Sequence, residues 1–395
     1  MTSRASCIAV IGGAGAMGRI IVRDLAELAP SDIEIVIGDR DVRAAERIAR
    51  TLPRRVRVVG IDATKPSSAV RALRGTVVLI NACHHSLNLR VMDIALAIRS
   101  HYCDLGGLFH ITRQQLRRDA EFKRAGLLAL CGIGSAPGIV NIMARAGADR
   151  LDRVEEIHIA VGTIDRTVRQ GESPLATSYS IETVLDEASQ PAAIYEHGKL
   201  GFVEPLSRAV PVRFPPPVGL RHPVCTIHSE LATLPRAFRA KGVRDVSFRI
   251  AFPGALTERL RLVNALGLAG REPIVVDGRR IAPRDVLRAL VSTRAISSSG
   301  GVPDEYEVLR VTLRGRRGRT RVEDVLDCHV PGMPAWGIGV DIDTGAPPSI
   351  VSQMILDGRI QTRGVAAPES AVPTDPFFRA LAARGMRVLR RSRRL

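Results

Sequence analysis

The chain has 395 residues, a formal net charge of +17 and 45% hydrophobic residues. That length exceeds what one ordinary hydrophobic core holds, so two domains are expected. The basic residues are nearly all arginine and are spread along the chain, whereas a nucleic-acid-binding protein gathers them on one face. We therefore expect no nucleic-acid partner.

The cysteines and the apolar segments favour a cytoplasmic protein. The six cysteines lie far apart without C-x-x-C spacing, which is typical of reduced thiols and argues against a disulfide framework or a zinc site. The uncharged run 127–144 contains Gly132, Gly134 and Pro137, which would break a membrane-spanning helix. Neither a membrane partner nor a metal is therefore expected.

The start of the chain has the pattern of a dinucleotide-binding strand, turn and helix. An apolar strand is predicted at 7–11, and the G-x-G-x-x-G turn that follows has Gly13, Gly15 and Gly18 as its glycines. They permit, in that order, a tight turn, close approach of the backbone to a pyrophosphate, and close packing of the helix on the strand. The N–H groups at the start of the helix, at Ala16 and Met17, would bind the phosphates.

A second anchor for the cofactor lies at the end of the next predicted strand, 33–38. Asp39 follows this strand about 20 residues beyond the turn, where a carboxylate binds the ribose of a dinucleotide. A lone glycine turn occurs by chance in many α/β proteins, but here the strand, the helix and Asp39 are all in register. Asp39 would repel a 2′-phosphate and Arg40 would attract one, so NAD and NADP both stay open, with NAD preferred.

The remaining elements alternate between strand and helix. Four strands are expected at 55–59, 77–81, 101–104 and 127–130, with helices at about 66–73, 87–99 and 112–123. With the first two strands they predict an α/β fold, a doubly wound parallel sheet of the Rossmann type.

The character of the sequence changes near residue 150. An α+β domain for substrate binding and dimerisation is expected there, with strands at 154–161, 243–252, 306–313 and 322–330 and a helix at 283–292. Two arginine-rich runs are expected to be a solvated hairpin tip, at 314–319, and a frayed terminus, at 387–394.

Ligands of open α/β sheets bind at the carboxyl ends of the strands, which directs attention to the residues that close the fourth and fifth strands. Asn81 and Ala82 are expected to line the cofactor, although Asn81 could equally be a turn residue. Adjacent side chains of an extended segment point opposite ways, so at most one of His84 and His85 is expected to face the cleft, and His85 is preferred as the proton donor. A structural histidine is the alternative.

Asp104 is expected to orient this proton donor or to hold a substrate ammonium group, unless it only caps a turn. The N–H groups near Gly138, at the start of a predicted helix, could bind a substrate carboxylate, or the segment could be only a hinge. Glu230 could meet the amino end of a lysine-like substrate, and Arg236 could pair with a carboxylate.

The glycine-rich turn and four further segments resemble the saccharopine dehydrogenase-like family, especially its saccharopine reductase branch. The segments are 101–107 (HYCDLGG), 134–141 (GSAPGIVN), 228–235 (HSELATLP) and 364–369 (GVAAPE), so the resemblance spans nearly the whole chain. It implies an NAD- or NADP-dependent enzyme that oxidises or reduces a C–N bond of an amino-acid-derived amine. Relatives include lysine 6-dehydrogenase and carboxynorspermidine dehydrogenase.

The resemblance also implies the domain limits and the assembly. Residues 1–135 would bind the nucleotide, 136–346 the substrate, and 347–395 would fold back onto the nucleotide domain; a homodimer is expected. The saccharopine-forming reductases carry a lysine in the helix after the fourth strand, where this chain has 90–93 (RVMD). A small amine other than the saccharopine precursors is therefore expected as substrate. A carbonyl or enoyl reductase and a non-catalytic NAD(P) sensor are the alternatives.

Overall fold

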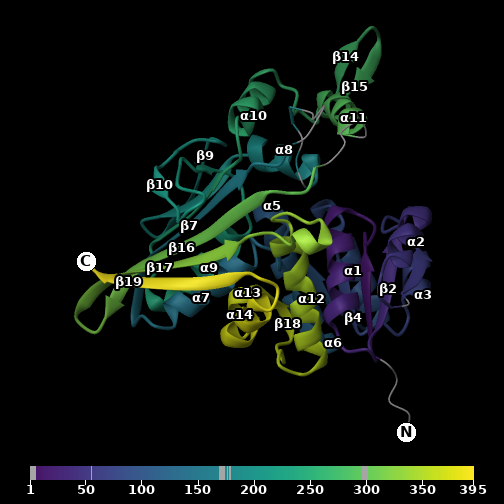
Figure 1. Ribbon diagram of the computed structural model, residues 1–395, viewed down its shortest axis with the longest axis horizontal. Coiled ribbons are helices and arrows are strands. Elements are labelled where there is room, and N and C mark those ends of the chain that lie inside the picture. Colours follow the sequence, from purple (N-terminus) through teal and green to yellow (C-terminus); the bar gives the residue numbers. More distant parts are fainter. Residues whose placement is uncertain (1–5, 55, 169–173, 176, 178, 296–300) are drawn as a thin grey trace.

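A computed structural model describes residues 6–54, 56–168, 174–175, 177, 179–295 and 301–395. Two large β-sheets organise them, and each is the centre of one domain (Figure 1). Arg55, the expected first residue of the third strand, lies outside the described residues. The prediction of an α/β Rossmann domain followed by a second domain is confirmed.

The first domain is built on a seven-stranded parallel sheet in the order β18-β6-β5-β4-β1-β2-β3. Its central strands are fully buried, as the apolar runs require when helices cover both faces. The six predicted strands are confirmed, and β18 from the C-terminal region adds a seventh. The strands are β1 (Cys7–Ile11), β2 (Glu34–Asp39), β3 (Arg57–Gly60), β4 (Val78–Asn81), β5 (His101–Asp104), β6 (Leu128–Leu130) and β18 (Gly364–Ala366).

The helices of this domain follow the predicted segments with one difference. The expected helix at 112–123 is two helices, because the backbone leaves the helical conformation at Arg118, where the guanidinium binds Asp93, Glu121 and the carbonyl of Leu89. The helices are α1 (Ala16–Leu28), α2 (Val42–Arg50), α3 (Pro66–Ala72), α4 (Asn88–Ile98), α5 (Leu108–Leu116) and α6 (Asp119–Ala125), with a 3-10 turn at His85–Leu87.

The second domain is built on an eight-stranded mixed sheet in the order β19-β17-β16-β7-β13-β8-β9, with β12 paired to β13. Its long strands contain three of the four predicted segments, and β13 lies within the fourth, 243–252. The expected hairpin tip at 314–319 is shorter than predicted, because residues 314–317 still belong to β16 and only 318 and 319 turn the chain into β17. The strands are β7 (Arg153–Asp165), β8 (Ala192–Glu196), β9 (Lys199–Val203), β12 (Val224–Cys225), β13 (Asp245–Ala251), β16 (Glu305–Arg317), β17 (Thr320–Val330) and β19 (Arg387–Arg394).

Helices and two small hairpins complete the second domain, and α10, α11 and the β14–β15 hairpin project from it (Figure 1). The predicted helix at 283–292 is α11. The hairpins are β10 (Val212–Arg213) with β11 (Leu220–Arg221), and β14 (Ile274–Val276) with β15 (Arg279–Ile281). The helices are α7 (Ile139–Ala148), α8 (Ile181–Ser189), α9 (Glu230–Ala237), α10 (Leu256–Ala265) and α11 (Pro283–Ala295), with a 3-10 turn at Arg239–Lys241.

The C-terminal region contributes strands to the sheets of both domains. Helix α12 (Ile342–Leu356), which follows a 3-10 turn at Pro334–Trp336, packs on α1, and β18 extends the first sheet. After α13 (Pro368–Ala371) and α14 (Thr374–Ala382), β19 returns to the second sheet along β17 (Figure 1).

The expectation of a frayed terminus at 387–394 is wrong. These residues form β19, and three of their five arginines pair with acids of the neighbouring strand β17. Arg390 binds Asp324 at 2.6 Å, and Arg393 binds Glu323 at 2.7 Å. The charge run is therefore one side of a cross-strand ion-pair network. Among the described residues, no helix has both the length and the apolar character needed to cross a bilayer.

Candidate active site

The glycine-rich turn has the geometry that a dinucleotide requires. A Cβ atom built on Gly18 would lie 2.0 Å from the carbonyl oxygen of Gly12, so only glycine allows α1 to start so close to the turn. Gly15 and Ala16 are exposed at the start of α1, and within the described part of the chain no side chain caps this end. Free N–H groups at an exposed helix start suit a pyrophosphate. The turn therefore fits a nicotinamide dinucleotide.

Asp39 lies at the end of β2, beside the turn. Its carboxylate accepts hydrogen bonds from the backbone N–H groups of Ala14, at 2.9 Å, and Asp41, at 3.0 Å. Asp39 thereby braces the turn against β2, a role that the sequence did not indicate. Arg40 is exposed. A carboxylate of the kind that binds a ribose and a cation of the kind that binds a 2′-phosphate therefore follow each other at the end of β2.

The residues that follow β4 contact the same glycine-rich turn. Ala82 donates its N–H to Ile11 at 2.8 Å, and a Cβ atom on Gly12 would lie 3.1 Å from the Ala82 carbonyl. The Asn81 side chain is buried, accepts from the Cys83 N–H at 3.1 Å and donates to Asn88 at 2.9 Å. The backbone of Ala82 thus lines the turn, whereas the Asn81 side chain holds the loop from behind.

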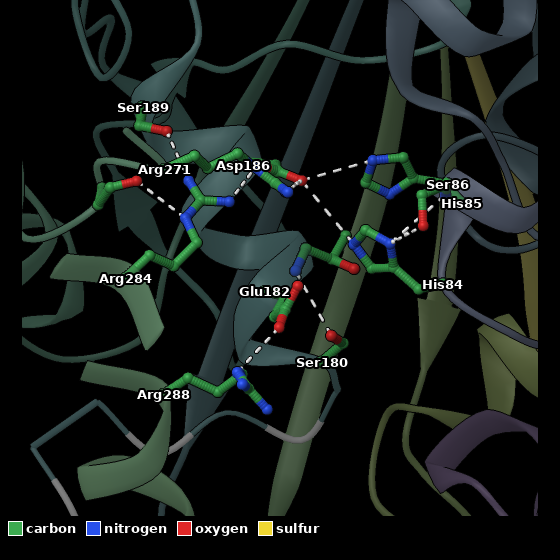
Figure 2. Close-up of polar contacts among 12 residues, drawn as sticks. His84, His85, Ser86, Ser180, Glu182, Asp186, Ser189, Arg271, Arg284 and Arg288 are labelled. Carbon is green, nitrogen blue, oxygen red and sulfur yellow. Dashed lines mark hydrogen bonds and ion pairs between the residues drawn. The ribbon is translucent and has the colours of Figure 1, made fainter. Parts of the chain in front are cut away.

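The loop then brings two histidines to one carboxylate of the second domain (Figure 2). The Nε2 atoms of His85 and His84 lie 3.4 Å and 3.8 Å from the Oδ2 atom of Asp186, which is on α8. The expected alternation of the two side chains, with at most one of them facing the cleft, is wrong, because the backbone turns into a 3-10 helix at His85 and both rings lie on one side, with ring centroids 4.0 Å apart. His84 is oriented by the hydroxyl of Ser86, at 2.9 Å.

Two arginines engage Asp186 from the other side (Figure 2). Arg284 is buried and binds Oδ1, and Arg271 binds Oδ2 at 2.8 Å. Burial raises the pKa of a carboxyl group, but these two guanidinium groups hold the pKa of Asp186 below its usual value. Because Asp186 is already neutralised, it attracts little positive charge to the histidines.

Both histidines are therefore uncharged at neutral pH. Burial lowers the pKa of His84, and burial together with the neighbouring His84 ring lowers the pKa of His85 to about 4. The nitrogen and oxygen atoms of His84, His85 and Asp186 lie within 4.8 Å of one another, as metal ligands do. The two arginines on Asp186, however, oppose a cation there. The group is better suited to proton transfer.

Asp104, the last residue of β5, is fully buried, and its two oxygens accept four hydrogen bonds. Oδ1 binds the N–H groups of Gly106, at 2.9 Å, and Gly132, at 2.7 Å; Oδ2 accepts from Tyr102, at 2.9 Å, and Gln115, at 2.5 Å. Burial raises the pKa of this carboxyl. Asp104 thus ties the loops after β5 and β6 together, as the turn-cap alternative describes, and both of its oxygens already accept hydrogen bonds.

The N–H groups near Gly138 are already engaged. Gly138 donates to Asn141 Oδ1 at 3.0 Å, and Ile139 and Val140 donate to the carbonyls of Gly134 and Ser135. The expected carboxylate site at this helix start is therefore not offered by the structure. Gly138 instead allows a close turn, since its φ is +133° and an added Cβ atom would lie 2.0 Å from the Gly134 carbonyl.

Glu230 and Arg236 lie at opposite ends of α9. Glu230 is fully buried beside His228, 3.2 Å from its Nδ1 atom, and Glu187 of α8 lies 3.6 Å from its Nε2 atom. Arg236 is exposed and lines a separate hollow of about 320 Å³ with residues of α6 and β18. The structure thus places Glu230 beside α8, which carries Asp186, and leaves Arg236 apart from it.

Asp186 and Glu187, both on α8, were not predicted as site residues from the sequence. Asp186 and Glu187 stand within a run that is otherwise apolar, with Val184, Leu185 and Ala188 buried around them. Two acids on the buried face of an amphipathic helix were the available signal. Arg284 and Arg271, by contrast, could not be distinguished from the many other arginines.

Family models match the chain over most of its length. The saccharopine dehydrogenase NADP binding domain matches residues 8–130, and the saccharopine dehydrogenase C-terminal domain matches residues 134–386. The chain belongs to the saccharopine dehydrogenase family. It is accordingly an NAD(P)-dependent oxidoreductase, which confirms both the resemblance and the expected class of cofactor.

Similar proteins cover the whole length. Carboxyaminopropylagmatine dehydrogenase from Synechocystis sp. is 24% identical over 95% of this chain and 96% of the relative, and carboxynorspermidine synthase from Vibrio alginolyticus is 20% identical over 95% and 94%. Saccharopine dehydrogenase (L-Glu forming) from Saccharomyces cerevisiae has the same fold, with a TM-score of 0.73 at 17% identity over 98% and 100% of the two chains. Homospermidine synthase from Legionella pneumophila, solved with NAD, has a TM-score of 0.65 at 14% sequence identity, and the match covers 98% of this chain and 91% of that one.

Proposed function

We propose that this member of the saccharopine dehydrogenase family transfers a hydride at the C–N bond of an amine derived from an amino acid or a polyamine. The observation that carries the proposal is the position of two uncharged histidines at the loop that closes the dinucleotide turn. His84 and His85 follow Ala82, whose backbone contacts Gly12. A proton acceptor and a hydride carrier at one edge of the sheet are what amine oxidation requires.

The two histidines supply the proton chemistry. A bound nicotinamide would accept the hydride from the carbon or return it. An amine must lose its ammonium proton before that carbon can give up a hydride, and His85 is unprotonated at neutral pH, so a ring nitrogen is free to accept that proton on its way to solvent. In the reverse direction, His85 would pass a proton from solvent to the nitrogen. Asp186 orients the His85 ring, since its Oδ2 lies 3.4 Å from Nε2.

The substrate class follows from the family and from the relatives. The relatives are named for carboxyaminopropylagmatine and carboxynorspermidine, which are carboxylated amines. NAD is proposed as the preferred cofactor, because the Asp39 carboxylate lies where it would repel a 2′-phosphate.

We also propose a cytoplasmic homodimer. The six cysteines are unpaired, which suits a reducing compartment. The projecting α10, α11 and β14–β15 carry exposed apolar side chains, a pattern typical of an interface between copies. These side chains are Leu262, Leu266, Ile274, Val275, Val276, Val286 and Leu290.

A cofactor titration followed by a substrate screen tests the proposal. NADH and NADPH binding is measured by fluorescence, and the absorbance of reduced nicotinamide is then followed with lysine, saccharopine, diamines and pairs of a semialdehyde with an amine. Binding with amine-dependent turnover is expected, and light scattering of the same sample should give the mass of two chains. Binding without such turnover, or reduction of carbonyl or enoyl compounds instead, would reject the C–N reaction.

A further inference from the structure

The β14–β15 hairpin lies at the far tip of the projecting part of the second domain (Figure 1). A two-residue turn joins its strands at Asp277 and Gly278, whose φ angles are +47° and +75°, as a tight hairpin turn requires. In the described part of the chain, β14 and β15 form a sheet of two strands and pair only with each other. A hairpin of two strands is marginally stable in water, and a further strand is what stabilises it.

Of the two free edges of the hairpin, that of β14 suits a further strand. All three residues of β14 are β-branched, and the side chains of Ile274, Val275 and Val276 are 53%, 70% and 45% exposed. Such residues favour a pleated surface that is at least half buried. Strand β15 instead contains Arg279 and Arg280, and charged side chains protect an edge strand from pairing. The hairpin therefore has one apolar strand and one charged strand.

A second copy of β14 fits this apolar edge. Two identical strands can pair antiparallel about a two-fold axis, which is the symmetry of most homodimers. With the axis at Val275, each Val275 lies opposite Val275 of the second copy, and each Ile274 lies opposite Val276, so every cross-strand pair is apolar. The product is a sheet of four strands with β15 at both edges. Two β15 strands paired about Arg280 would instead bring like charges together.

The two ends of this hairpin are held at the candidate active site (Figure 2). Arg271 lies just before β14, and Arg284 lies just after β15. Arg271 binds Oδ2 of Asp186 at 2.8 Å, and Arg284 binds Oδ1. The same Oδ2 atom lies 3.4 Å from Nε2 of His85. One short loop therefore joins the apolar tip to the carboxylate that orients the proton acceptor.

The base of the hairpin is closed by Arg284. Its Nε atom donates to the carbonyl of Ala269 at 2.8 Å, and its backbone N–H donates to the carbonyl of Gly270 at 3.1 Å. The side chain of Arg284 is 5% exposed, whereas that of Arg271 is 56% exposed. Arg271 is therefore the partner of Asp186 whose position depends most on the hairpin.

We propose that a second copy of this chain pairs through β14 and thereby fixes the arginines that hold Asp186 at the histidine site. The proposal rests on the proposed homodimer and C–N reaction, and it adds the strand that makes the contact and the effect of that contact on the site. Without the second copy, the hairpin fluctuates and the exposed Arg271 moves with it. Asp186 then loses one of its two neutralising partners, and its carboxylate is no longer fixed beside His85.

A single cysteine tests the strand pairing. Val275→Cys places two thiols opposite each other on the two-fold axis, so mild oxidation should join most chains into covalent dimers on a non-reducing gel. Leu200→Cys, at an exposed apolar residue of the edge strand β9, is the matched control and should stay a single chain. Of the native cysteines, all but the partly exposed Cys83 are buried. Val275→Cys chains that stay single would overturn the proposed pairing.

Val275→Lys tests the link between the contact and the site. Two lysines on the axis repel each other, so the mass by light scattering should fall from two chains to one, whereas Leu200→Lys should keep two. In the single chain, amide hydrogen exchange of α8 should become about fivefold faster or more. Its turnover number with the best amine should fall about tenfold at unchanged NADH affinity.

The inference is overturned if Val275→Lys stays a dimer, or if its single chain matches the wild type in both α8 exchange and turnover. A wild type that is a single chain and turns over an amine would also overturn it, while keeping the proposed reaction. A wild-type dimer that turns over no amine would reject the reaction. The cross-link, the mass and the exchange of α8 would still decide the inference in that case.

Discussion

At the residue scale, the site depends on side chains that hold its loops as much as on those that face a substrate. Asp104 accepts four hydrogen bonds and lies at the base of the loops after β5 and β6. Asn81 and Asn141 hold the β4 loop and the start of α7 in a similar way. These buried groups fix the backbone on which His85 and Gly134 lie.

Replacing Asp104 with asparagine should therefore destabilise the first domain. The amide would place donor hydrogens against the donors of Tyr102 or Gln115 and leave them unpaired. We expect a loss of about 2 kcal/mol in the free energy of unfolding, measured by urea denaturation. Asp32→Asn, at an exposed position, is the control and should change little. Equal stability of the two variants would show that Asp104 does not hold these loops.

Individual residues were predictable where the chemistry is local in sequence. The spacing of Gly13, Gly15 and Gly18 and the position of Asp39 identify the cofactor turn because they are set by one strand, turn and helix. The pattern of α8 could have marked Asp186 as a buried acid, but its partners, His85 and Arg284, could not be predicted because they are far from it along the chain. The same holds for Glu187 and His228.

At the element scale, the C-terminal region connects the two domains through a buried ion pair. Arg384 follows α14 and binds Asp24 of α1 with two hydrogen bonds, of 2.6 Å and 2.7 Å. Both side chains are almost fully buried. A fork-shaped guanidinium on a carboxylate in such a place fixes the return of the chain onto the nucleotide domain.

Replacing only one of the two residues of this ion pair should lower the free energy of unfolding strongly. Asp24→Asn or Arg384→Met leaves one buried charge without its partner, and we expect a loss of about 3–5 kcal/mol in the free energy of unfolding. The double variant Asp24→Leu with Arg384→Met should recover much of that loss. Glu46→Gln, which removes an exposed ion pair with Arg50, is the matched control and should cost well under 1 kcal/mol, on the scale of about 0.5. Urea denaturation that ranked Asp24→Asn with this control would refute the account.

The strands of the first domain could be predicted from local sequence patterns, whereas the C-terminal strand β19 could not. Strands such as β1, β4 and β6 are short, mostly apolar runs that can be recognised one at a time. Strand β19 is rich in arginine and makes sense only beside Glu323, Asp324 and Asp327 of β17. Its stability comes from a neighbour that is distant in sequence, so the local pattern predicted a frayed end.

At the scale of the whole molecule, the net charge is +17, and many of the arginines form ion pairs with carboxylates of neighbouring strands. Acids neutralise the arginines of β16 and β19, as Asp327 does for Arg310 and Arg391. The two-domain organisation was predictable from length and pattern, whereas the way α8 meets the first domain was not.

The central claim is that His85 moves the proton while a nicotinamide carries the hydride. The direct measurement is the turnover number of His85→Asn with the best amine, beside NADH affinity measured by fluorescence; His222→Asn, at an exposed histidine, is the control. The account predicts unchanged NADH affinity and a turnover number reduced about a hundredfold or more, the usual contribution of a positioned acid–base group. A His85→Asn enzyme that binds NADH and turns over like the control would contradict it.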